Sequence, residues 1–135
     1  MYSTKFSVSI HILCMIALSN GEPITSEYIA GSINTNPALV RKLMSVLKKN
    51  GFIKAQTKLG ATGLAMAREE ISLRDVFKAV EKQQRLFAIH EDTNQNCPVG
   101  AKIGEVLERV NSEIQSRFET QLHYIHLSDI LEGLK

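Results

Sequence analysis

The stretch from Thr25 to Asn50 constrains this chain most, because it carries the signals of two helices joined by a tight turn. Asn36 is a good N-cap for the second helix, and Pro37 suits the first helical position, where a missing N–H costs nothing. From there, apolar residues recur at the three-and-four spacing of one helix face, and Asn50-Gly51 is typical of a C-terminal cap. The opposite face is polar and carries Arg41, Lys42, Ser45, Lys48 and Lys49.

A shorter helix that begins at Thr25 or Ser26 precedes this one, with Ile29 and Ile33 facing inward. A short helix, a turn and a second helix with a basic end form the helix–turn–helix pattern, whose second helix enters the major groove of DNA. An ordinary helical hairpin with solvated lysines explains the same residues. The local sequence leaves that alternative open.

The charge of the chain is divided unevenly. Residues 1–58 carry seven Lys and Arg against two Glu, a balance of +5, whereas residues 59–135 carry nine against twelve Asp and Glu, a balance of −3. This distribution suits a protein that faces a polyanion such as double-stranded DNA with one end only.

Cysteine content and hydropathy indicate the compartment. Two cysteines, Cys14 and Cys97, are too few for a disulfide framework, so we expect a reducing compartment, the cytoplasm. No segment is apolar over the roughly 20 residues that span a bilayer, so no membrane association is expected. The apolar residues of 4–19 lie on one face of an amphipathic first helix, in which Cys14 is expected to be buried.

A β-hairpin follows the basic helix. Residues 51–57 and 64–67 predict two strands around a glycine-bearing tip at 58–63. A hairpin in this place is a wing, and Lys58 is the one basic residue of its tip. A plain hairpin without DNA contacts remains the alternative. Ser72 then caps a further helix, predicted over 73–82.

A long helix predicted over 99–122 carries more apolar surface than one neighbour covers, which predicts pairing with a second copy of the chain. A short helix capped by Ser128 ends the chain. We therefore predict a mainly α fold with a small β-hairpin: a winged helix–turn–helix domain over 1–82, a sensor loop over 83–98, and a dimerisation helix with a C-terminal helix over 99–135. The predicted dimer interface consists of Val99, Ile103, Val106, Leu107, Val110, Ile114 and Phe118.

The order of these parts resembles the Rrf-two family of bacterial winged-helix transcription regulators, which includes the IscR, NsrR and CymR types. The most specific motifs are Asn36 to Leu43, Lys49 to Ile53, and Ile71 to Glu81. The segment Cys97 to Ala101 is similar to that of the YwnA-like members. The resemblance covers essentially the whole chain and implies a homodimer, docked through its long helices, that binds a partly palindromic operator.

Two departures from the family pattern matter. Iron–sulfur members place three cysteines in and after the loop, whereas this chain has only Cys97 there. No iron–sulfur cluster, other cofactor or metal is therefore expected. The usual Gly-Gly-aromatic of the wing is reduced to Thr62-Gly63-Leu64, which puts base contacts from the wing in doubt.

The residue types suggest two kinds of DNA contact. Asn36, Pro37 and Ala38 begin the second helix, and the resemblance places Arg41 in the major groove, where arginine can make a bidentate contact to guanine. Lys42 and Ser45 share the polar face with it. Phosphate contacts, which position the protein without specifying sequence, are expected from Thr25, Ser26, Lys48, Lys49 and Lys58.

Cys97 is the candidate sensor, because it lies in a polar loop at the start of the predicted long helix, whose dipole favours a thiolate. Oxidation or alkylation there would reorient the helix and change operator affinity. A thiol with no signalling role is the competing interpretation. An enzyme is not expected, since the chain lacks a phosphate loop and a paired-histidine metal motif. A protein-binding adaptor that keeps the fold without specific DNA binding is the alternative function.

Overall fold

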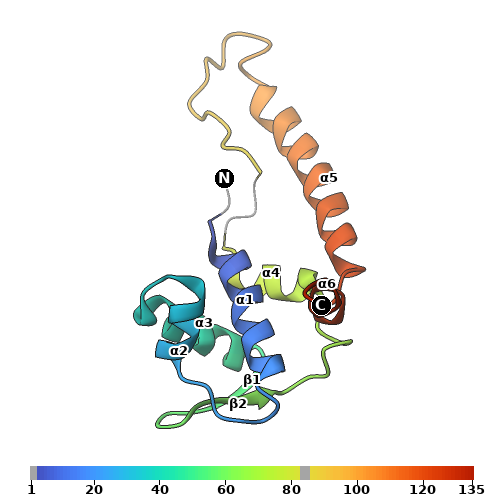
Figure 1. The fold of residues 1–135 in the computed structure, drawn as a ribbon. Helices are drawn as coiled ribbons and strands as arrows, with labels where there is room; N and C mark the ends of the chain where they lie inside the picture. The colour runs from blue at the N-terminus through green and yellow to red at the C-terminus, as the bar shows by residue number, and fades with distance from the viewer. Residues whose placement is uncertain (1–2, 83–85) are drawn as a thin grey trace.

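Helix α1 (Lys5–Leu18) lies at the centre of the molecule, because its side chains are apolar on more than one face. The computed structural model describes residues 3–82 and 86–135, so the first two residues of the predicted winged domain and residues 83–85 of the predicted sensor loop lie outside the described chain. Helices α2 (Ser26–Ile33) and α3 (Pro37–Lys49) pack on one side of α1, and α4 (Leu73–Val80) packs on another (Figure 1).

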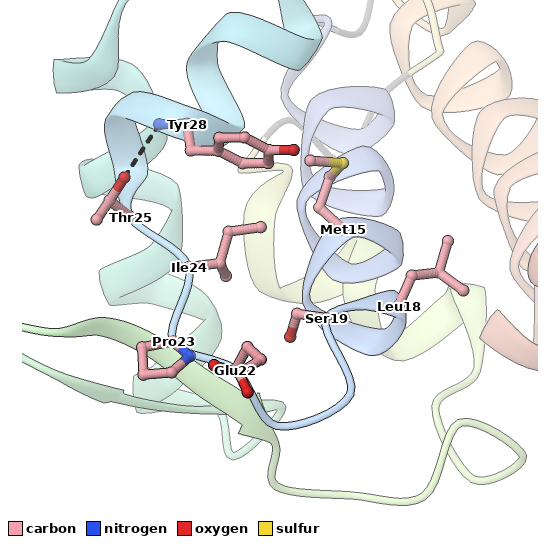
Figure 2. A pocket seen from close by; sticks show the side chains of 8 residues that line it. All are labelled: Met15, Leu18, Ser19, Glu22, Pro23, Ile24, Thr25 and Tyr28. Atoms are coloured by element: carbon pink, nitrogen blue, oxygen red, sulfur yellow. Dashed lines mark hydrogen bonds between the residues drawn. The ribbon is translucent and has the colours of Figure 1, made fainter.

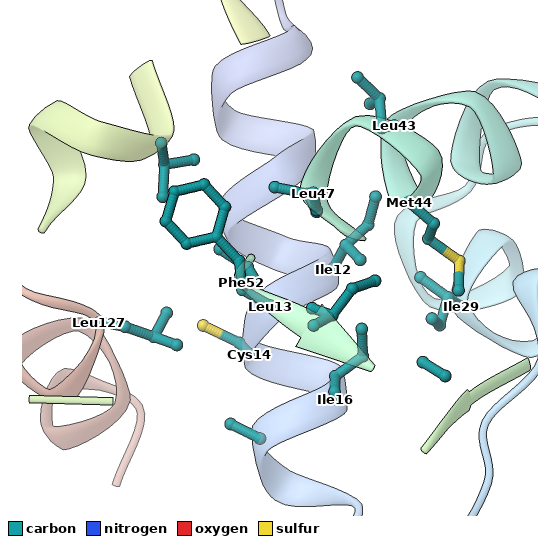
Figure 3. Packing of buried hydrophobic residues seen from close by; sticks show 14 of the residues in the cluster. Ile12, Leu13, Cys14, Ile16, Ile29, Leu43, Met44, Leu47, Phe52 and Leu127 are labelled. Carbon is teal, nitrogen blue, oxygen red and sulfur yellow. The ribbon is translucent and has the colours of Figure 1, made fainter. Parts of the chain in front are cut away.

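The core forms where α1 meets α3 (Figure 3). Ile12, Leu13 and Ile16 of α1 are at most 1% exposed, and Leu47 of α3 is fully buried beside them. Burying each such side chain contributes about 1.5–3 kcal/mol. The thiol of Cys14 belongs to the same cluster, so the prediction that this cysteine is buried is confirmed.

The wing is a two-stranded antiparallel hairpin of β1 (Ile53–Gln56) and β2 (Gly60–Leu64). The second strand begins earlier in the sequence than predicted, because Gly60, Ala61 and Gly63, which were assigned to the tip, already pair with β1. A bulge between Lys54 and Ala55 shifts the register, which lets the glycine-bearing segment remain in the ladder. The tip is therefore only three residues long, 57–59.

Ile24 joins this hairpin from the segment before α2. Its N–H donates to the Ala61 carbonyl and its carbonyl accepts from the Ala61 N–H, both at 2.9 Å. Gly60 permits this approach, because its φ is +90° and a Cβ there would collide with the Ile24 carbonyl oxygen. These contacts fix the wing against the start of the helix–turn–helix.

Helix α5 (Ile103–His123) rises away from the body, and the segment that precedes it extends beyond the same end of the molecule (Figure 1). The helix begins four residues later than predicted, because residues 98–102 form a separate turn. Asn111 is buried and accepts a 2.8 Å hydrogen bond from the Leu86 N–H, which fixes the connecting segment to α5. None of the helices in the described chain is long and apolar enough to cross a membrane.

The C-terminal part of α5 packs on α4 through aromatic and ionic contacts. The ring of Phe77 packs edge-to-face on Phe118, with ring centroids 5.3 Å apart, and also on Phe6 at 5.5 Å. Glu119, whose side chain is 12% exposed, lies 3.0 Å from the ammonium group of Lys78 and 3.8 Å from Arg74. These contacts join the C-terminal part of α5 to α4.

Helix α6 (Leu127–Gly133) returns to the winged body. Leu127 is fully buried and Leu131 is 5% exposed in the cluster that contains α1 and α3. The C-terminal helix therefore shares the core of α1 and α3. Its predicted cap was misplaced: His126 is the N-cap residue, and its N–H donates to the Asp129 carboxylate at 2.9 Å.

Candidate nucleic-acid interface

The two helices of the helix–turn–helix begin at the two N-cap residues that the sequence predicts, Thr25 and Asn36. The Thr25 hydroxyl accepts a 3.1 Å hydrogen bond from the Tyr28 N–H at the start of α2. The Asn36 side-chain oxygen accepts from the Leu39 N–H at 2.8 Å at the start of α3. Between the helices, Asn34 adopts the left-handed conformation, with φ +63° and ψ +50°, and allows the sharp turn.

Helix α3 presents two different faces. Val40, Leu43, Met44 and Leu47 are buried against the core. The predicted DNA-binding residues on the other face, Ala38, Arg41, Lys42, Ser45, Lys48 and Lys49, are exposed, as is Asn36 at its start, and Pro37 is half-buried. The amphipathic pattern thus places the polar residues in solvent.

Part of this polar face borders a groove between α3 and the wing. Arg41, Ser45 and Lys48 follow one another by helical turns along the α3 side of the groove. Gln56 and Thr57 line it from the wing. The groove has a volume of about 290 Å³ and carries two cationic side chains. Its chemistry is suited to an anionic strand that runs between the helix and the wing.

Arg41 is held at the edge of this groove by a residue of α2. Its Nη1 donates to Glu27 Oε1 at 3.2 Å, and the other carboxylate oxygen of Glu27 accepts from the Ser26 hydroxyl at 3.3 Å. The two charged side chains remain 57% and 66% exposed, for Arg41 and Glu27 respectively. An ion pair this exposed contributes only about 0–1 kcal/mol to stability, so its main effect is on orientation.

The remaining predicted phosphate-binding residues are placed differently. Lys58 is exposed at the tip of the wing, and Thr25 is exposed although its hydroxyl caps α2. Ser26 is only 8% exposed, and it reaches the groove as a wall residue. Across residues 3–82 and 86–135, none of Lys42, Lys48, Lys49 and Lys58 has a carboxylate within ion-pair distance.

Three residues near this surface were not recognised in the sequence. Lys54 is exposed on β1, while its neighbour Ile53 is buried. The alternation of the strand was the available signal for Lys54. Gln56 and Thr57 line the groove from the wing, opposite residues of α3 that are distant in sequence, and the local sequence holds no signal for that.

A second groove lies behind the N-terminus of α2, on the side of α1 (Figure 2). It has a volume of about 520 Å³, and Met15, Ile24 and Tyr28 form much of its apolar wall. Glu22 also lines it. The predicted DNA-binding residues, apart from Thr25, do not line this groove.

The predicted dimer face of α5 is partly exposed as an apolar stripe. Val106, Val110 and Ile114 are 40%, 42% and 43% exposed and lie on one side of the helix at spacings of four residues. Ile103 and Leu107 are half-buried, and Val99 is 67% exposed in the preceding turn. Phe118 differs from the prediction, since it packs on Phe77 of its own chain.

Cys97 is exposed, and it lies before a turn and not at the start of α5 as predicted. Hydrogen bonds from the backbone N–H groups of Gly100 and Val99 lower the pKa of the Cys97 thiol below its ordinary value. The relevant dipoles therefore belong to the turn and not to the long helix. By contrast, burial raises the pKa of Cys14.

The loop around Cys97 is tightly closed. The Thr93 hydroxyl donates to the Gly100 carbonyl, and the Cys97 N–H donates to the Asn94 carbonyl at 3.2 Å. A Cβ at Gly100 would collide with the Asn94 carbonyl oxygen, so this position requires glycine. The loop thus holds the thiol in a fixed place relative to its hydrogen-bond donors.

Comparison with known proteins identifies relatives over almost the whole chain. The Rrf2 profile, described as "Iron-dependent Transcriptional regulator", matches residues 2–133. A Bacillus subtilis (strain 168) protein that carries the name of an HTH-type transcriptional regulator, YwnA, is 38% identical over 134 residues, which are 99% of each chain. A crystal structure described as that of a DNA-binding protein is 32% identical, with a TM-score of 0.77 over 94% of this chain and 98% of the other.

The fold is also that of CymR, described as the global cysteine regulator of B. subtilis, at 22% identity. The TM-score is 0.67, over 96% of this chain and 94% of CymR.

The iron in the family description has no evident donor set here. A protein-bound iron–sulfur cluster is held mainly by cysteine thiolates, and this chain has one exposed cysteine in the loop and one buried in α1. In the described parts of the chain, no three His, Cys, Asp or Glu side chains gather as metal ligands would. The described residues do not fit an iron site.

Proposed function

This chain belongs to the Rrf2 family of transcriptional regulators, and on that premise we propose that it is a homodimeric DNA-binding regulator, in its simplest form a repressor, of a partly palindromic operator. The observation that carries this proposal is the groove between α3 and the wing, where Arg41, Ser45 and Lys48 face Gln56 and Thr57. It provides a cationic channel beside a helix whose polar face is free to enter the major groove.

The proposed contacts divide by chemistry. Arg41 and Lys42 read base edges, with Asn36, Pro37 and Ala38 bringing the start of α3 to the DNA. Ser45, Lys48 and Lys49 continue along the same exposed face toward the backbone, and Thr25, Ser26 and Lys58 contact phosphates from α2 and the wing. Exposure of the lysines without carboxylate partners among the described residues supports this division.

The proposed dimer forms through α5. Val106, Val110 and Ile114 leave an apolar stripe in solvent that a second α5 would cover, with Ile103, Leu107 and Val99 extending it. Phe118 is excluded from this part of the proposal because it packs within its own chain. Two copies related by a two-fold axis would place two α3 helices at half-sites about one helical turn, roughly 34–36 Å, or a multiple of it apart.

The proposed signal is oxidation or alkylation of Cys97, without a metal or cofactor. In the oxidative case the thiolate attacks one peroxide oxygen, the O–O bond breaks, and the products are a sulfenic acid and hydroxide. The exposed, low-pKa thiol supports this chemistry. A change in the closed loop would pass to α5 and, through Phe118 and Glu119, to α4.

Binding of the reduced protein to its own upstream DNA, compared with random DNA over a salt series, tests the proposal. We expect a preference for the upstream DNA and a steep fall of affinity with salt, because each phosphate contact releases counterions. Weak binding without preference would refute the regulator and favour a protein-binding adaptor in the same fold.

Two variants test the assigned contacts. Arg41→Ala should relax sequence preference, because a bidentate guanine contact supplies about 1–3 kcal/mol of discrimination. Lys49→Ala should weaken all DNA about equally and reduce the salt slope by about 1. Equal losses on both DNAs for Arg41→Ala would remove its assignment as a base reader.

The sensor role of Cys97 is tested in the same assay with mild peroxide. Wild type should change its operator affinity after treatment, and Cys97→Ser should not. The same response in the two proteins, or no response in either, would remove the redox switch and leave Cys97 as an ordinary exposed thiol.

A further inference from the structure

Arg41 is the one cation of α3 that has an ion-pair partner in the part of the chain that the structure describes. Glu27 Oε1 lies 3.2 Å from Arg41 Nη1. The second carboxylate oxygen is anchored by the Ser26 hydroxyl at 3.3 Å, so the carboxylate is held from two sides. Glu27 lies in the first turn of α2, where the positive end of the helix dipole favours a negative charge.

An acid at this place is unexpected for a surface that binds a polyanion. Residues 1–58 contain only two acids, Glu22 and Glu27. Glu22 lines the groove behind α2, whereas Glu27 forms an ion pair with Arg41 of α3. A residue that lowers the positive potential at the centre of the interface weakens binding to DNA in general.

We infer that Glu27 is a specificity-determining residue of the DNA interface, which positions Arg41 for a base edge and opposes binding through phosphates alone. This inference rests on the proposed function and concerns how the same surface discriminates between DNA sequences. Glu27 acts through Arg41 and needs no contact with DNA itself.

The positioning effect follows from the geometry of the guanidinium group. A guanidinium has five N–H donors in a rigid plane, and the ion pair uses Nη1. The Nε and Nη2 donors, which have no partner among the described residues, remain available for the O6 and N7 atoms of a guanine. Because Glu27 already restrains the side chain, less rotamer freedom is lost when that contact forms.

The opposing effect follows from charge. On random DNA, Arg41 gains most by turning to a phosphate, and it must then leave Glu27 without its partner. The unpaired carboxylate of Glu27 is also repelled by the phosphate that has taken its place as the partner of Arg41. On a matched site, Arg41 keeps the ion pair and binds the base, so this cost is not incurred. Glu27 therefore lowers random binding more than specific binding.

The test is a double-mutant cycle on two DNAs, a site selected from a random-sequence pool by the wild-type protein and a scrambled duplex of the same length. Glu27→Gln keeps the shape of the side chain and removes its charge. Glu22→Gln is the matched control, since it removes the other acid of this region without touching Arg41. Thermal unfolding of each variant establishes that the fold is retained, as expected for substitutions at exposed positions.

We expect Glu27→Gln to strengthen binding to the scrambled duplex more than to the selected site, so that the specificity ratio falls roughly twofold to fivefold, the range of an exposed ion pair. In the Arg41→Ala background the same change should leave the ratio constant, and Glu22→Gln should leave it constant in wild type. Equal strengthening on both duplexes, or the same change of ratio without Arg41, would overturn the inference. Failure of the proposed function is separately visible, because the pool would then yield no enriched site for wild type.

Discussion

Gly60→Ala should damage the junction between the wing and the segment before α2 far more than the similar substitution Gly51→Ala. The two glycines have similar positive φ values, +90° for Gly60 and +82° for Gly51. A Cβ at Gly51 meets no atom within 4 Å, whereas at Gly60 it would collide with the Ile24 carbonyl and come within 3.0 Å of Thr25 Cα. The pair of variants therefore separates backbone strain from the loss of this contact.

The magnitudes follow from these differences. Alanine in the left-handed region costs about 1–2 kcal/mol at either site, partly offset by the reduced entropy of the unfolded chain. Gly60→Ala additionally displaces Ile24 and strains the two 2.9 Å hydrogen bonds with Ala61. At about 0.5–1.5 kcal/mol each, their loss adds about 1–3 kcal/mol. With an unfolding entropy of about 2.1 cal/mol/K per residue, this corresponds to a Tm lower by roughly 4–10 °C than that of Gly51→Ala.

Urea and thermal unfolding at one protein concentration measure the difference, because the stability of the proposed dimer would depend on concentration. Hydrogen exchange at the Ala61 N–H, which donates to Ile24, reports the junction directly and should accelerate only in Gly60→Ala. Equal midpoints for the two variants, together with unchanged exchange at Ala61, would refute the reasoning about the close approach.

Other parts of the structure give three further predictions. Alkylation of Cys97 should reach half its maximal rate at a lower pH in the folded protein than in urea, because backbone N–H groups stabilise the folded thiolate; identical pH midpoints would contradict this. Val110→Asp should yield monomers in sedimentation, whereas Phe118→Ala should keep the dimer and lower the free energy of unfolding by roughly 3 kcal/mol. Monomers from Phe118→Ala would argue that Phe118 acts at the dimer interface and not in its contact with Phe77. Asn36→Ala should cost about 1 kcal/mol of stability through its lost cap, while Ser128→Ala, at a position that is not a cap, should stay within about 0.5 kcal/mol of wild type by urea unfolding; equal costs would contradict the cap assignments.

Local signals in the sequence were sufficient wherever one segment determines its own structure. Asn36 and Pro37 predicted the first residues of α3, and the structure begins this helix at Pro37. Ser72 was predicted to cap the next helix, and its hydroxyl accepts a 3.1 Å hydrogen bond from the Asp75 N–H at the start of α4. Capping and helical periodicity act within a few residues, so they can be read without knowledge of the rest of the chain.

Predictions that depended on a distant partner were less accurate. Phe118 has the same spacing as the exposed residues of α5, and only the position of Phe77 turns it toward its own chain. Leu127 is part of a short helix in sequence, yet it fills the core beside α1. Periodicity shows that a residue is apolar on one face, but it does not identify which surface will cover that face.

The sequence by itself determined the helix–turn–helix, its caps, the basic face of α3 and the family. The tertiary structure alone decided that Glu27 pairs with Arg41 and that the wing closes a groove beside Lys48. It also decided that the N–H groups that donate to the Cys97 sulfur come from a separate turn. The physical reason is the range of the interactions. Caps and amphipathic faces arise between residues a few positions apart, whereas Glu27 and Arg41 are fourteen residues apart and meet only when α2 packs on α3.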